Sequence, residues 1–75
     1  MLSDERAAEF VNELLFELFQ RLDESVTKVR SLAPAQEAEA YSRVVGQIAG
    51  AIVMDILEKL YEKHPQLKPP NWETD

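Results

Sequence analysis

The chain has 75 residues, of which 14 are acidic and eight are basic, and it contains no cysteine. A chain of this length forms one domain, and its core is marginal because folding buries only about 60% of the surface that the unfolded chain exposes. The missing cysteines exclude disulfides, thiolate metal sites and cysteine nucleophiles, while the net charge of −6 without a basic cluster disfavours nucleic-acid binding.

The first predicted element is an amphipathic helix over about residues 3–31. Ser3 is expected to cap it, and Asp4 and Glu5 place negative charge in its first turn, where the helix dipole favours it. An apolar seam follows in alternating steps of three and four residues. The seam consists of Ala8, Val11, Leu15, Leu18, Leu22, Ser25, Val29 and Leu32. The N-terminus lacks the basic start and apolar run of a signal peptide, so we expect a cytoplasmic protein.

A second helix is expected over about residues 34–64. Pro34 disfavours helical geometry in the residue before it and suits the first turn of a new helix, and Pro65 ends that helix. Because the link is short, the two helices should lie side by side and antiparallel. Residues 1–64 are therefore predicted to form an all-α helical hairpin, followed by an extended, proline-containing tail over 65–75.

The middle of the second helix, residues 44–57, is apolar or small on nearly every side. This run is shorter than the roughly 20 apolar residues of a membrane span and contains Gln47 and Asp55, so we expect no membrane insertion. One neighbouring helix cannot cover such a surface. We therefore expect a homodimer in which two hairpins form a four-helix bundle around the second helices, with Val44, Ile48 and Ile52 packed on the first helix.

A row of small residues marks the expected dimer interface. Ser42, Gly46 and Gly50 recur every four residues, and a glycine inside a helix costs about 1 kcal/mol relative to alanine, which calls for a packing reason. We expect that reason to be a close crossing with a second chain. The alternative is close packing against the chain's own first helix. The whole predicted interface comprises Ser42, Gly46, Gly50, Val53, Leu57, Leu60 and Tyr61.

The polar residues form no catalytic, nucleotide-binding or metal-binding pattern. His64 is the sole histidine and is expected to be a helix-end residue favoured by the dipole, because a lone imidazole is poorly equipped to hold a metal ion. Asp55 is expected to pair with Lys59 one turn later. We therefore expect no metal or other cofactor, and a protein that is not an enzyme.

Two aromatic residues stand in polar surroundings. Phe16 projects among the acidic residues of the first helix, and Trp72 lies in the tail after Leu67. Exposed aromatic side chains are common at interfaces, so Phe16, Leu67 and Trp72 are candidates for binding another protein. The alternative is that the tail folds back and covers its own bundle.

These features predict a small non-enzymatic helical interaction protein, acting as an adaptor, regulator or assembly subunit in the form of a homo-oligomer. A second hypothesis is an apolar-ligand carrier or a minor subunit of an enzyme complex, in which Tyr41, Gln47 and Asp55 line a pocket between the helices. The sequence does not distinguish a dimer from a tetramer and identifies no particular partner.

Overall fold

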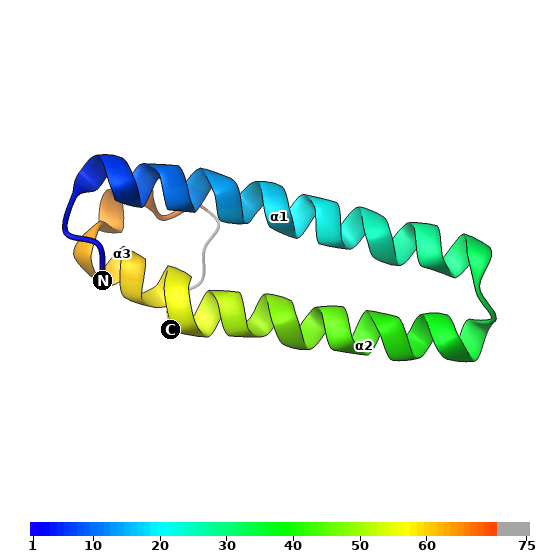
Figure 1. Ribbon diagram of the computed structural model, residues 1–75. Helices are drawn as coiled ribbons and strands as arrows, with labels where there is room; N and C mark the ends of the chain where they lie inside the picture. The colour runs from blue at the N-terminus through cyan, green and yellow to red at the C-terminus, as the bar shows by residue number, and fades with distance from the viewer. Residues whose placement is uncertain (71–75) are drawn as a thin grey trace.

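The structure is a computed structural model that describes residues 1–70, and in that range it is an antiparallel helical hairpin without strands (Figure 1). Helix α1 spans Glu5–Leu32. The second helical arm is built from α2, Ala35–Ile52, a π-helical turn η1, Val53–Leu57, and α3, Glu58–Lys63. A 3₁₀ turn η2, Pro65–Leu67, follows this arm. The predicted all-α hairpin is confirmed.

Helix α1 begins with a different cap from the one predicted. Asp4 is the N-cap, and its carboxylate accepts hydrogen bonds from the backbone N–H groups of Arg6 at 2.8 Å and Ala7 at 3.2 Å. The prediction of Ser3 was therefore wrong by one residue. A carboxylate at this position satisfies two unpaired N–H groups and also complements the positive end of the helix dipole.

The link between the helices consists of Ala33 and Pro34. Ala33 closes α1 by donating its backbone N–H to the carbonyl oxygen of Val29 at 2.9 Å. Pro34 is the N-cap of α2 and lies just before the first turn, where its carbonyl oxygen accepts the N–H of Ala38 at 3.0 Å. After this short link the second arm runs back along α1, antiparallel to it (Figure 1).

The π-helical turn changes which residues of the second arm face α1. Such a turn holds one extra residue, so everything after it is rotated by about 100° relative to an uninterrupted α-helix. Leu57, Leu60 and Tyr61 consequently face α1 and are buried, with exposed fractions of 0%, 0% and 4%. Their predicted position on an outward face, which assumed a continuous α-helix, was wrong for this reason.

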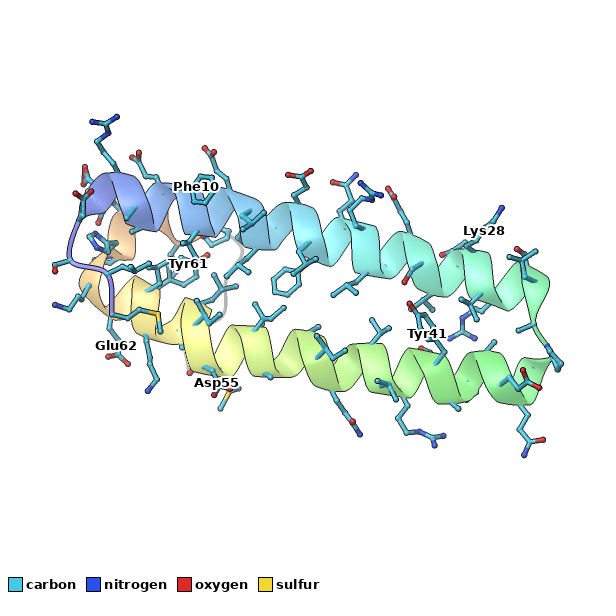
Figure 2. The ribbon with its side chains drawn as sticks, in the orientation of Figure 1. Phe10, Lys28, Tyr41, Asp55, Tyr61 and Glu62 are labelled. Atoms are coloured by element: carbon cyan, nitrogen blue, oxygen red, sulfur yellow. The ribbon has the colours of Figure 1, made fainter. Side chains whose placement is uncertain are left out.

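The core lies at the end of the hairpin that holds the N-terminus and α3. Its buried members are Ala8, Leu15, Leu57, Leu60 and Tyr61, and the partly buried residues packed on them are Val11, Phe19, Ile52, Val53, Ile56 and Leu67. Figure 2 shows Tyr61 between the two arms, where its hydroxyl donates a hydrogen bond to Oδ1 of Asn12. Burial raises the pKa of the Tyr61 hydroxyl, which therefore stays protonated as this donor.

Polar contacts close the same end of the hairpin. His64, the C-cap of α3, is only 7% exposed, and its Nε2 lies 2.7 Å from the carbonyl oxygen of Leu2. Because a carbonyl oxygen only accepts, the imidazole is the donor. Gln66 adds a second contact by donating its side-chain amide to the carboxylate of Glu5 at 3.0 Å. His64 thus lies at a helix end, as predicted, and also holds the N-terminal segment against α3.

Replacing Asp4 by alanine is expected to lower the free energy of unfolding by about 1 kcal/mol, because two N–H groups of the first turn lose their partner. Ser3→Ala is the matched control and should leave stability unchanged. Urea unfolding followed by circular dichroism measures both. Equal losses in the two variants would contradict the cap described here.

Candidate functional site

The contact between the two arms leaves two broad sides of the hairpin uncovered, and a hydrogen bond between the arms marks each of them. On one side, the hydroxyl groups of Tyr41 and Ser25 are 2.8 Å apart. On the other side, Nη2 of Arg30 donates to Oγ of Ser42 at 3.3 Å, and Nη1 of Arg30 lies 3.7 Å from the carboxylate of Glu39. Neighbouring residues such as Tyr41 and Ser42 point about 100° apart around a helix, so each contact marks a different side.

The side marked by Tyr41 and Ser25 is apolar. Residues three, four and seven apart lie on the same side of a helix, which places two rows of large side chains beside that contact. These residues, which we call the apolar face, are Phe10, Leu14 and Leu18 on α1 and Tyr41, Val44 and Ile48 on α2. Each of them exposes between 37% and 66% of its surface. The apolar face therefore consists of two rows of large side chains that the single chain leaves largely uncovered.

Helix α2 is rotated relative to the prediction. Val44 and Ile48 expose 51% and 46% of their surface, whereas Val45 and Ala38 are buried at 8% and 2%. The expectation that Val44, Ile48 and Ile52 pack on α1 was therefore wrong for Val44 and Ile48, whereas Ile52 is partly buried against the core. Because α2 is apolar on several sides, its sequence alone does not single out the stripe that contacts α1.

The opposite side carries a groove of about 850 Å³ between α1 and α2. Its α2 wall includes Ser42, Gly46, Ala49, Gly50 and the adjoining Val53, and its α1 wall includes Phe19, Gln20, Asp23, Val26, Thr27 and Arg30. Four of the predicted interface residues thus line this groove, while Leu57, Leu60 and Tyr61 belong to the core. The predicted set does not form one surface.

The two glycines are not required by packing within the hairpin. A Cβ atom added to Gly46 or Gly50 would meet no atom within 4 Å. This observation excludes the alternative in which the glycines allow α2 to approach α1 closely. They remain on the open wall of the groove.

The candidate partner-binding residues are partly covered by the chain itself. Phe16 is 37% exposed and packs edge to face on Phe19, with ring centroids 5.8 Å apart. Leu67 is half-buried against the core. Trp72 lies outside the described residues. Phe16 therefore has an aromatic neighbour within α1, and its capture of another protein stays a prediction.

Asp55 is exposed and points away from α1 (Figure 2). Within residues 1–70, the ion pairs are Arg21–Glu24 at 3.9 Å and Arg30–Glu39 at 3.7 Å. The expected pair of Asp55 and Lys59 is therefore not formed. Tyr41, Gln47 and Asp55, the residues expected to line a pocket, are also absent from the lining of the groove.

The second arm is long and apolar enough to cross a membrane when only length and composition are considered, over Ala35–Lys63. Only 11% of the residues in its most apolar window are buried in the hairpin. Core helices of soluble proteins pass the same test when other elements cover them. The arm thus has an apolar surface that the single chain leaves largely open.

Comparisons with protein-family models, with curated proteins and with solved structures found no match to this chain. Across residues 1–70, no group of three or more histidine, aspartate or glutamate side chains is placed to hold a metal ion. The two open sides of the hairpin are accordingly the features from which a function can be proposed.

Replacing Gly46 or Gly50 by alanine is expected to raise the free energy of unfolding by about 1 kcal/mol, because each change favours the helix and meets no neighbouring atom. Ala51→Gly, at an exposed position of the same helix, is the matched control and should lower stability by a similar amount. Thermal and urea unfolding measure these changes. A destabilised Gly46→Ala would instead reveal a close contact at the groove in solution.

Proposed function

We propose that this chain is a small non-enzymatic interaction protein, an adaptor, regulator or assembly subunit, that acts as a homodimer forming a four-helix bundle. The observation that carries the proposal is the area left exposed. The chain exposes 5641 Å², whereas a folded monomer of 8.6 kDa exposes about 4,700 Å² by the general scaling of surface with mass. The excess of roughly 900 Å² is close to what one partner buries in a standard protein interface.

The shape of the hairpin supports the same proposal. It measures 44 × 24 × 21 Å and has a radius of gyration of 14.7 Å, compared with about 11 Å for a compact domain of 75 residues. A hairpin is one layer of helices, and stable helical domains pack at least two layers around a core. A second hairpin would supply the missing layer.

The exposed apolar surface of the second arm is better suited to contact with protein than to contact with lipid. Asp55 is exposed in the apolar arm and lies away from its ends, and a carboxylate costs several kcal/mol in the hydrocarbon interior of a bilayer. In a bundle, an exposed side chain can stay in water while the opposite stripe is buried. We accordingly propose a soluble assembly in the cytoplasm.

The non-enzymatic role is supported by how the reactive side chains are used. The chain has one histidine and no cysteine, and the imidazole of His64 is buried in its contact with the carbonyl oxygen of Leu2. A general base must reach its substrate and a nucleophile needs an activating base within hydrogen-bond distance. A scaffold for protein contacts requires neither.

Sedimentation equilibrium is expected to give twice the chain mass of 8.6 kDa at tens of micromolar. The physical reason is the burial of an interface whose apolar area contributes roughly 25 cal/mol per Å², enough to outweigh the entropy lost on association. Dilution should shift the protein toward monomer by mass action. A folded species of 8.6 kDa at these concentrations would overturn the proposal and the bundle with it.

An apolar-ligand carrier is the second candidate, and the groove beside Gly46 and Gly50 supports it. Its volume of about 850 Å³ lies within the usual range of small-molecule sites, roughly 300 to 1,000 Å³. Phe19, Val26 and Val53 supply apolar contacts along it. In this proposal the ligand contacts these groove residues, and Tyr41, Gln47 and Asp55 do not belong to the binding site.

Binding of the apolar dye anilinonaphthalene sulfonate to the folded protein tests this second candidate. If the groove takes apolar ligands, Gly50→Leu should reduce dye affinity by roughly tenfold by filling it, the equivalent of about 1.4 kcal/mol. Ala40→Leu adds the same side chain at an exposed position outside the groove and should have no effect. Equal dye binding by all three proteins would rule the groove out as the site.

A further inference from the structure

We infer that the partner on the apolar face is a second copy of this chain, packed face to face, and that the groove with Gly46 and Gly50 stays open on the outside of the dimer. This inference rests on the homodimer proposed above and specifies which side of the hairpin forms it. It moves the interface from the row of small residues to the six large side chains of the apolar face.

The chemistry of the two sides favours the apolar face. Its rows on α1 and α2 consist of large apolar or aromatic side chains that are 37% to 66% exposed. On the groove side, α1 presents a mixed wall, in which Asp23, Thr27 and Arg30 stand beside Phe19 and Val26. Burying such polar groups without new partners is costly, whereas exposed apolar side chains gain from leaving water. Burial of the apolar face therefore gains more than burial of the groove side, and we place the second hairpin on the apolar face.

At the hydroxyl contact between Ser25 and Tyr41, beside the apolar face, both hydroxyl hydrogens already have acceptors. The hydroxyl of Ser25 donates to the carbonyl oxygen of Leu22 at 2.6 Å, and a hydroxyl has only one hydrogen to donate. The hydrogen of the 2.8 Å contact between Ser25 and Tyr41 therefore belongs to Tyr41. Both donors keep their partners when the face is covered, so dimerisation leaves neither hydroxyl hydrogen unpaired.

The position of the rows suits a two-fold dimer. Phe10, Leu14 and Leu18 lie in the N-terminal half of α1, beside the core, and Tyr41, Val44 and Ile48 lie in the half of α2 next to the link. The apolar face thus runs diagonally across the hairpin. A two-fold axis along that diagonal brings each row against the same row of the second copy, and such a contact closes at two chains.

The charge-insertion pair Ile48→Glu and Gly50→Glu tests the choice of side. Ile48→Glu should weaken dimerisation by roughly a hundredfold or more, because two-fold symmetry places one new carboxylate from each chain in the buried interface. Gly50→Glu adds the same charge two residues away in the groove and should leave the dimer intact. Sedimentation equilibrium gives the dissociation constants, and circular dichroism reports whether each variant is helical. Loss of the dimer in Gly50→Glu with its retention in Ile48→Glu overturns the inference.

Thiol accessibility keeps the test valid if Ile48→Glu fails to fold, and the absence of native cysteine makes each label unambiguous. In the dimer, Ile48→Cys should react with a maleimide roughly tenfold or more slowly than Gly50→Cys, and dilution to monomer should remove the difference.

A dimer with a protected Gly50→Cys overturns the assigned side but leaves the homodimer standing. A monomeric wild type overturns both. Protection of Ile48→Cys only after addition of phosphatidylcholine vesicles would identify lipid as the occupant and also overturn the inference.

Discussion

Two packed helices share a single line of contact, and this constraint governs every other feature of the hairpin. One neighbour covers one stripe of a helix, and the remaining circumference meets water or another molecule. At the end of the hairpin where the N-terminus lies, the fully buried side chains of Leu57 and Leu60 occupy the line of contact. Toward the link, the smaller Ala38 and Val45 occupy it. The apolar residues beside this line are not buried by the contact between the two arms, and their positions determine what the molecule can bind.

Much of the fold could be predicted because its signals are local. The breaker at Pro34, the apolar period before it and the stop at Pro65 give the hairpin and its link to within about two residues. The π-helical turn over Val53–Leu57 has no such signal. A π turn persists when tertiary contacts offset its poorer backbone geometry, here through burial of Leu57 and Leu60. Those contacts exist only in the folded hairpin.

The candidate surfaces were less predictable for a related reason. Helix α2 is apolar around most of its circumference, and packing selected Val45 over Val44 and Ile48. On α1, Leu18 was placed in the apolar seam that packs on the second helix, yet it is 40% exposed and lies one turn after the similarly exposed Leu14. Spacing correctly placed the small residues in one row. It contained no information on whether that row meets α1 or an open groove.

The position of the core reverses the usual order in which a hairpin loosens. Chain ends are commonly the first part of a domain to fray, while a tight link holds its neighbours together. In this molecule Leu2 is held by His64 and Glu5 by Gln66, whereas the arms near Pro34 meet through small side chains beside the groove. The turns of α1 and α2 near the link, which Ala33 and Pro34 keep joined, are therefore expected to open by local unfolding before the end that holds the core.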